Sequence, residues 1–356
     1  LLVAAELARL FDEPDVATYL VETADAWNDC IDHWMYASGS ERDRHFDVDG
    51  YYVRVAPLET DDETTRLQSS VPVKNVPLPD ADTAASDLIS CDALALVRFG
   101  LRTAEDRRIV NTIRLIDRLL KVETPAGPSW HRYNGDGYGE HADGSPFDGT
   151  GIGRAWPLLT GERAHYELQA GHLDQARSLL AAFEAMASGS GLLPEQIWDT
   201  ADIPERELFC GRAAGSAMPL VWAHAEYVKL RRSLHDGAVF DLPPQTVRRY
   251  LVNHTVSAYG VWRFNQKIRI LDRGRTLRIE TTAPTRLHWT SDDWITTADH
   301  ASRDTGLDVH VTDLPTESLV DGDRVQFTMF WPEANQWEGT NFTVTVAGPD
   351  KRSNAA

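Results

Sequence analysis

The chain contains 356 residues, of which 42% are apolar, so it can bury a sizeable core and is long enough for more than one domain. Its 54 acidic residues outnumber its 35 basic ones and give a formal net charge of −19, which argues against nucleic acid or an anionic membrane as a partner. No segment approaches the roughly 20 consecutive apolar residues of a membrane span, and we therefore expect a soluble globular protein.

The acidic residues are mostly aspartates: 34 are Asp, whereas only five of the basic residues are Lys. An Asp-rich, Lys-poor surface stays hydrated where high salt screens its self-repulsion. The composition therefore predicts a protein from a high-salt organism, and it does not distinguish a cytoplasmic from a secreted location. The three scattered cysteines, Cys30, Cys91 and Cys210, fit neither a disulfide framework nor a Cys-x-x-Cys metal site.

The first 234 residues predict about seven helices, because their apolar residues recur at intervals of three and four. The predicted segments are 1–11, 17–34, 92–100, 107–122, 154–171, 173–187 and 217–234. Between them lie two long loops rich in Gly, Pro and Asp, at 37–84 and 123–152. Loops of that length inside a compact helical domain are usually functional.

Later residues alternate between apolar and polar side chains and are rich in β-branched types, which predicts a small β-sandwich or β-sheet module. The predicted strands are 258–265, 276–282, 285–290, 307–314, 324–331 and 341–346. The pair Pro243-Pro244 marks the change of pattern. We therefore predict a helical domain at 1–239 and a β-rich domain at 240–356.

Three stretches of the helical part, 128–141, 151–168 and 191–200, combine Trp and Tyr with Arg and carboxylates. A sugar ring offers C–H faces for stacking and hydroxyls for hydrogen bonds, so this combination predicts a carbohydrate site. Cleavage of a glycoside also needs two carboxyl groups, which lie roughly 6.5–9.5 Å apart in an inverting enzyme. Glu195, expected in a loop between helices, is a candidate for the general base.

The residues alone leave other interpretations open. A Pro-Glu pair such as Pro194-Glu195 more often begins a helix, because Glu is favoured in the first turn. Glu162 and Arg163 are expected to bridge helices rather than to contact sugar. The "NGDGYGE" sequence at 134–140 lacks the ligand spacing of a calcium loop, and we expect no metal or organic cofactor.

Four motifs are similar in order and spacing to those of the prokaryotic branch of glycoside hydrolase family 15, the glucoamylases and their glucodextranase relatives. They are "WHRYNGDGYGE", "GRAWPLLTGERAHYEL", "LLPEQIWD" and "GSAMPLVWAHAEYVKL". The β-rich end also resembles the C-terminal extension of such proteins. The resemblance implies a mainly α fold: a partial (α/α)6 barrel, containing the last seven of twelve helices, followed by a small β-rich domain.

The resemblance also implies roles for individual residues. Glu195 of the "PEQ" sequence matches the general base, Arg132 matches the arginine that holds hydroxyls of the terminal glucose, and Trp156 matches a tryptophan that lines the same pocket. Further candidates for the pocket wall are Trp130, Tyr133, Asp136 and Trp198.

The activity implied by the resemblance is that of an inverting, exo-acting hydrolase that releases β-D-glucose from the non-reducing ends of starch-type α-glucans and malto-oligosaccharides. A glucodextranase or a trehalase of the same family is an alternative, because linkage preference depends on loops that the motifs do not include. A non-catalytic carbohydrate-binding remnant is an alternative from a different class.

One expected element is absent from the sequence. The family's general acid lies in a "DLWEE"-like stretch shortly before the helix that residues 1–11 represent, and the chain has no such stretch. We therefore expect the acid upstream of Leu1, in a missing N-terminal part of the same protein that this chain would pack against. The alternatives are a split or decayed gene, and a proton supplied instead by Glu140 or Glu162.

A barrel that lacks five helices would leave apolar inner faces in water. We predict that residues 1–356 expressed alone aggregate or melt without a cooperative transition. Size-exclusion chromatography and a thermal melt followed by circular dichroism test this expectation. A monodisperse monomer that melts cooperatively would contradict it.

Overall fold

The computed structural model describes residues 1–57, 63–77 and 81–348, which form two compact units. The helical unit contains the described residues of 35–57 and 67–253, and the β-rich unit contains those of 1–34, 63–66 and 254–348. The predicted loop at 37–84 lies partly outside the described residues, which omit 58–62 and 78–80.

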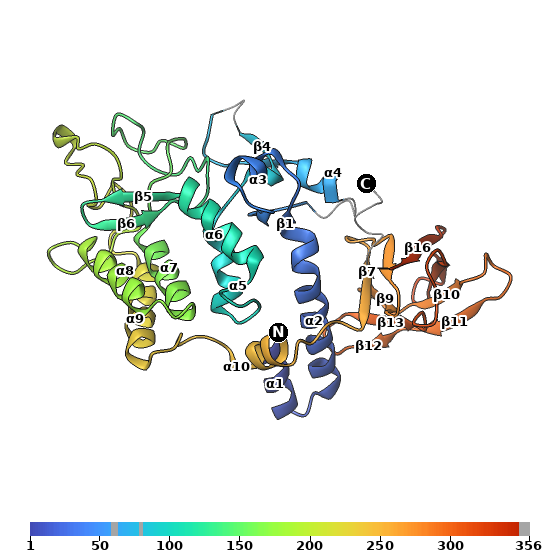
Figure 1. Ribbon diagram of the computed structural model, residues 1–356. Coiled ribbons are helices and arrows are strands. Elements are labelled where there is room, and N and C mark those ends of the chain that lie inside the picture. Colours follow the sequence, from blue (N-terminus) through green and yellow to red (C-terminus); the bar gives the residue numbers. More distant parts are fainter. Residues whose placement is uncertain (58–62, 78–80, 349–356) are drawn as a thin grey trace. The chain divides into compact units, whose positions relative to one another are not determined.

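Five of the predicted helices build the helical unit (Figure 1). They are α5 (Leu94–Arg98), α6 (Arg107–Leu119), α7 (Pro157–Gln169), α8 (Leu173–Ala185) and α9 (Val221–Asp236). Helix α7 packs against α5, α8 and α9, and eleven of its 13 residues are buried. It is therefore the central helix of this unit.

Local sequence signals explain where these helices begin and end. The Asp106 carboxylate accepts a hydrogen bond from the backbone N–H of Arg108 at 2.8 Å and so caps α6. Pro157 occupies the first position of α7, where its missing N–H costs nothing. Helix α9 ends at Gly237, whose φ of 70° closes the last turn in the left-handed conformation.

Shorter elements connect these helices. The short α-helical segments are α3 (Glu41–Phe46), α4 (Glu63–Gln68) and α10 (Pro244–Thr246). There are also 3-10 turns at Ala85–Asp87, Cys91–Ala93 and Pro204–Arg206 and a π-helical turn at Val247–Val252. Three antiparallel strand pairs complete the set: β1 (Tyr36–Ala37) with β2 (Tyr51–Tyr52), β3 (Ser70–Pro72) with β4 (Asp82–Ala84), and β5 (Lys121–Thr124) with β6 (Gly127–Trp130). The predicted loop at 123–152 thus begins with a hairpin, whose four-residue strands are too short for an alternating pattern to identify.

Two sheets form the β-rich unit. One has the order β12 (Arg303–Asp304), β13 (His310–Leu314), β9 (Thr276–Thr281), β7 (Tyr259–Arg263). The other has the order β11 (Ala298–Ala301), β10 (Arg286–Thr290), β14 (Arg324–Trp331), β16 (Phe342–Ala347), β8 (Ile270–Asp272), with β15 (Gln336–Trp337) paired to β14. Trp262 and Leu277 of the first sheet and Phe327 and Met329 of the second belong to one buried cluster, so the sheets pack face to face as a sandwich.

The first two helices, α1 (Leu2–Leu10) and α2 (Pro14–Met35), belong with the strands rather than with the other helices. The guanidinium of Arg278 on β9 is buried, bonds both oxygens of Asp313 at 2.7 and 2.8 Å, and reaches Glu22 of α2 at 2.7 Å. A buried cation needs such paired carboxylates, and this pairing attaches α2 to the sheet. The compact units therefore differ from the predicted domains of 1–239 and 240–356, and that domain division stays a prediction.

All seven predicted helices and all six predicted strands are confirmed, with ends that shift by a few residues. The short strands β8, β11, β12 and β15 were not predicted, and none of the three cysteines, which all lie in the described residues, forms a disulfide. The arrangement of these helices as a partial (α/α)6 barrel, with about the last seven of twelve helices, stays a prediction. Across the described ranges, no helix is both long and apolar enough to cross a membrane.

Gly161 of α7 offers a test of this packing. A Cβ at this position would come within 2.8 Å of Cγ of Glu226 and of a ring carbon of Phe183. Gly161→Ala should therefore lower the free energy of unfolding by about 1–3 kcal/mol, although Ala stabilises an exposed helix interior relative to Gly. Urea denaturation followed by tryptophan fluorescence, on the longest polypeptide that the coding sequence provides, measures the change.

The matched control is Gly189→Ala, where nothing lies within 4 Å of an added Cβ. Equal effects of the two substitutions, or no effect of either, would show that α7 is not tightly packed at Gly161.

Candidate active site

Glu195 lies at a bend in an irregular segment, not at a helix start. Helix α8 ends at Ala185 and the next α-helix, α9, begins at Val221, so the interpretation of Pro194-Glu195 as a helix start is wrong. The backbone N–H of Glu195 instead donates to the carbonyl of Ala217 at 2.8 Å. The side chain is half-buried.

Three extended segments lie side by side at this point. Ile197 pairs with Ala155 on one side and with Ala213 on the other, and its N–H donates to the carbonyl of Ala155 at 2.9 Å. Because Trp156 follows Ala155 directly, this pairing brings the "GRAW" and "PEQIWD" sequences together. Backbone hydrogen bonds therefore join two motifs that are some forty positions apart in the chain.

Asp199 fixes the same junction with its side chain. Its carboxylate accepts hydrogen bonds from the backbone N–H of Ala155 at 2.9 Å and from Nη1 of Arg154 at 3.1 Å, and it pairs with Nε2 of His131 at 3.0 Å. Burial raises the pKa of the Asp199 carboxyl, but the hydrogen bonds and charges of His131 and Arg154 outweigh it and leave that pKa below its ordinary value. Asp199 thus holds three segments of the chain in one arrangement.

Arg132 is held by Asp136 among aromatic rings. Its Nε and Nη2 donate to the two oxygens of Asp136 at 2.7 and 2.8 Å, a bidentate pair that fixes the plane of the guanidinium. The guanidinium lies 4.9 Å from the ring centre of Trp156, 5.1 Å from that of Tyr138 and 5.6 Å from that of Tyr133. Burial lowers the pKa of Arg132, but the bonds to Asp136 and its charge outweigh burial and raise it.

Tyr138 connects the arginine to the glutamate. Its hydroxyl donates to Oε2 of Glu195 at 3.4 Å, and its ring packs at 6.4 Å from that of Trp156 and edge-on at 5.2 Å from that of Phe147. Burial and the neighbouring charge of Glu195 raise the pKa of the Tyr138 hydroxyl, which stays protonated at neutral pH. The sequence analysis did not identify Tyr138, although it lies in the same motif as Arg132.

A cleft of about 620 Å³ opens beside Glu195. Its walls include Tyr138, Glu140, Phe147, Glu195, Glu205 and Arg206. The buried carboxylate of Glu140 accepts a hydrogen bond from the N–H of Gly215 through Oε1, whereas its Oε2 has no hydrogen-bond partner among the described residues. A buried acceptor without a partner beside a cleft is a group that a ligand hydroxyl can satisfy.

The glycines of the "NGDGYGE" and "GTGIG" sequences allow two backbones to approach closely beside the cleft. A Cβ on Gly151 would clash with the carbonyl of Gly139, and a Cβ on Gly137 would clash with the carbonyl of Asn75. Only glycine permits such contacts. These glycines therefore allow the backbone on either side of Tyr138 to pack closely beside the cleft.

Within the described ranges, no group of three or more His, Cys, Asp or Glu side chains is arranged to hold a metal ion.

The predicted site residues thus fall into two groups. Glu195, Arg132 and Trp156 come together, with Asp136 and Tyr133 packed around Arg132. The carbonyl of Trp130 accepts a hydrogen bond from the N–H of Trp156 at 2.9 Å, but its indole N–H donates to Asp117 at 3.0 Å, under the guanidinium of Arg163. Trp198 is fully buried, and its indole N–H donates to the carbonyl of Ala201 at 2.7 Å.

Arg163 bridges helices, as the sequence predicts, because it pairs with Asp117 of α6 and with Glu167 of α7. Glu162 does not line the cleft, and burial together with the charge of Glu226 on α9 raises the pKa of the Glu162 carboxyl to about 7. Neither side chain of the "GER" sequence lines the cleft.

A family model, a related protein and a solved structure that match this chain are all glycosyl hydrolases. The family model described as "Glycosyl hydrolases family 15" matches residues 1–232. A glucoamylase from Clostridium sp. (strain G0005) is 36% identical over 259 residues, which cover 70% of this chain and 32% of that protein. A crystal structure of a bacterial glucoamylase complexed with acarbose is 34% identical, with a TM-score of 0.61, over 70% of this chain and 34% of that one. The chain therefore spans about a third of the length of these relatives.

The anchoring role of Asp199 can be tested through its pH dependence. Because the folded state lowers the pKa of Asp199, its stabilising contribution is complete above the pKa in the unfolded chain, about 3.9, and is lost as the pH falls through the lower folded value. Asp199→Asn should lower the free energy of unfolding at pH 7 by about 1–3 kcal/mol, and the difference from the wild type should shrink between pH 5 and pH 3.

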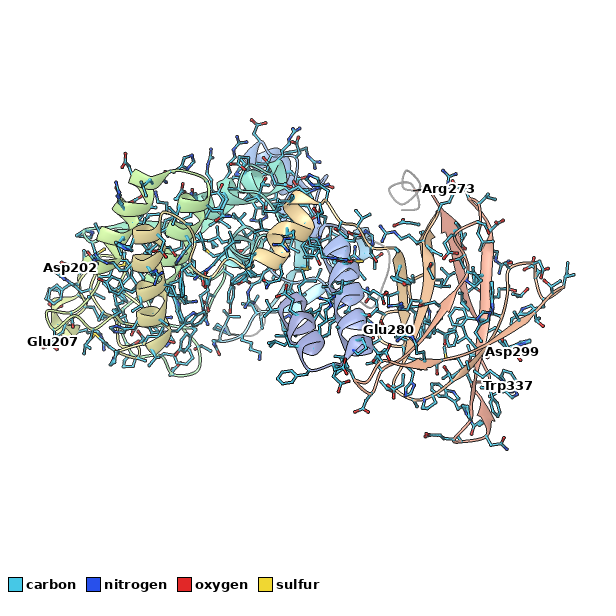
Figure 2. The ribbon with its side chains drawn as sticks, turned by 90° about the horizontal axis from the view of Figure 1, so that it is seen from below. Asp202, Glu207, Arg273, Glu280, Asp299 and Trp337 are labelled. Carbon is cyan, nitrogen blue, oxygen red and sulfur yellow. The ribbon has the colours of Figure 1, made fainter. Side chains whose placement is uncertain are left out.

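Urea denaturation at pH 7, 5 and 3, on the longest polypeptide that the coding sequence provides, measures the effect. The control is Asp202→Asn, on the exposed loop labelled in Figure 2, which should change the stability little at any pH. A deficit for Asp199→Asn that is the same at all three pH values would contradict a role for the ionised carboxylate.

Proposed function

The chain belongs to glycosyl hydrolases family 15, as its four motifs predict, and on that premise we propose that the protein containing it is an inverting, exo-acting α-glucoside hydrolase with Glu195 as general base. The two similar proteins are glucoamylases, which favours release of glucose from starch-type oligosaccharides. Because the chain spans about a third of their length, the proposal concerns the whole protein.

The observation that carries the proposal is the setting of the Glu195 carboxylate. It lines a cleft, and both of its side-chain hydrogen bonds, from the hydroxyl of Tyr138 and the N–H of Ala217, reach Oε2 at 3.4 Å. In the part of the chain that the structure describes, Oε1 accepts no hydrogen bond from the protein and is therefore available to a water molecule. A general base needs this combination of a fixed orientation and one accessible oxygen.

We propose the following reaction at this site. Oε1 of Glu195 takes a proton from water while the water oxygen attacks the anomeric carbon from the face opposite the glycosidic oxygen. A carboxylic acid on the other face protonates the leaving oxygen, so an α-glucoside yields β-glucose. Arg132, oriented by Asp136, would hold hydroxyls of the terminal glucose, and the rings of Tyr138 and Trp156 would pack against its C–H faces.

We place the general acid outside the 356 residues. Glu162 is unsuited to this role because it lies against α9, away from the cleft. Glu140 lines the cleft, but one of its oxygens is committed to the N–H of Gly215 and the other is buried, which suits binding of a hydroxyl better than proton transfer to a leaving group. Linkage preference, whether α-1,4, α-1,6 or that of trehalose, would depend on wall residues such as Phe147 and Arg206.

The test is the rate of glucose release from maltotriose at molar salt, with the longest polypeptide that the coding sequence provides. Glu195→Gln keeps the shape of the side chain but removes the base, so kcat should fall by about 10²–10⁴-fold. Glu207→Gln, an exposed carboxylate outside the cleft, is the matched control and should keep the wild-type rate.

Equal rates for the wild type and Glu195→Gln would remove Glu195 from the mechanism. No release by the wild type from maltotriose, isomaltotriose or trehalose would favour the carbohydrate-binding remnant instead.

A further inference from the structure

Four aromatic side chains gather on the outer face of the larger sheet of the β-rich unit. On β10, Leu287 and Trp289 are buried toward the core, so His288 between them faces outward. His288 pairs with Asp299 of β11 and Thr328 of β14, which share its face. Phe330 and Trp337 form the next pair on that face, between β14 and β15.

The rings of His288, Trp294, Phe330 and Trp337 contact one another in a row that we call the aromatic platform. Trp294 stacks on His288 with ring centres 5.6 Å apart and planes 21° apart. Trp337 meets His288 edge-on at 6.0 Å and Phe330 at 5.4 Å. Trp337 is 45% exposed and the other three rings are partly buried, so the platform is partly accessible to water.

The platform is held in place by polar contacts. Nδ1 of His288 lies 2.6 Å from Oδ1 of Asp299, and Figure 2 labels Asp299 and Trp337 on the strands of this unit. Trp294 has a φ of 68°, a left-handed conformation that is strained for a bulky residue. Its N–H donates to Oγ1 of Thr290, whose hydroxyl donates in turn to Asp292. The loop thus maintains a strained backbone that keeps the Trp294 ring against His288.

We propose that the aromatic platform binds a chain of neutral α-linked glucose units, a second carbohydrate site separate from the Glu195 cleft. Pyranose C–H faces would stack on Trp294 and Trp337, and their hydroxyls would bond to groups at the edge of the rings. The choice of glucan rests on the proposed function, since a polymeric substrate is what such a site would retain.

The groups beside the platform disfavour an anionic ligand. The chain as a whole carries −19, and besides Arg286, stacked over Phe330 at 5.0 Å, and Asp299, paired with His288, the neighbouring residues include the carboxylates Asp292, Asp293 and Glu338. Accessible ring surface with polar groups at its edge suits an uncharged polyhydroxyl molecule. The platform also lies outside residues 1–232, which match the family.

Affinity electrophoresis in native gels with and without soluble starch tests the proposal, with the polypeptide used for glucose release. A Glu195→Gln background prevents hydrolysis of the starch. We expect this protein to be retarded by starch, and Trp337→Ala or Trp294→Ala to weaken the apparent affinity about three- to ten-fold. Trp337→Phe keeps a ring and should restore part of the retardation. Ile295→Ala, 83% exposed in the loop of Trp294, is the matched control and should change nothing.

The outcomes separate this proposal from the proposed function. Retardation that is lost with the two tryptophans supports the platform even if no glucoside is hydrolysed. Hydrolysis by the wild type together with retardation that neither tryptophan affects would overturn the platform alone. Absence of retardation, or a self-association of the chain that Trp337→Ala abolishes while starch binding is unchanged, would also overturn it.

Discussion

The candidate active site depends on one buried carboxylate, that of Asp199. A charge removed from water must be paired, and Asp199 finds its partners on other segments: His131, Arg154 and the N–H of Ala155. Satisfying all three at once leaves one relative placement of the "HRY", "GRAW" and "PEQIWD" sequences. Arg132 and Glu195 each lie within four positions of these anchoring groups, so the placement of both follows from this one constraint.

The same physical principle recurs at Arg132 and at Arg278, where a planar guanidinium and a carboxylate bond in two places at once. At Arg132 the pair fixes the guanidinium of a side chain that keeps a third of its surface exposed. At Arg278 the pair is buried and connects α2 to the strands. A carboxylate thus fixes the plane of an arginine in both units, and at Arg278 it also joins elements of the fold.

Sequence reasoning succeeded where structure follows from local pattern. The 3.6-residue and two-residue periods predicted every long helix and strand, because burial of one face imposes them. It failed where contacts join distant positions: no local signal separates Trp156, beside Arg132, from Trp198, packed under Arg154 in the core. Glu195 could be singled out only through its motif, since Pro-Glu by itself predicted a helix start that the backbone pairing with Ala217 replaces. The attachment of α2 to the strands depends on Glu22 and Arg278, 256 positions apart.

The central claim, that Glu195 activates water on the face opposite the leaving group, fixes the stereochemistry of the product. The most direct measurement follows the anomeric proton signals of glucose by NMR in the first minutes of maltotriose hydrolysis, before mutarotation equilibrates them. If Glu195 activates water for a single displacement, β-glucose appears first. Initial release of α-glucose would mean retention of configuration, and Glu195 could not then be the base of a single displacement.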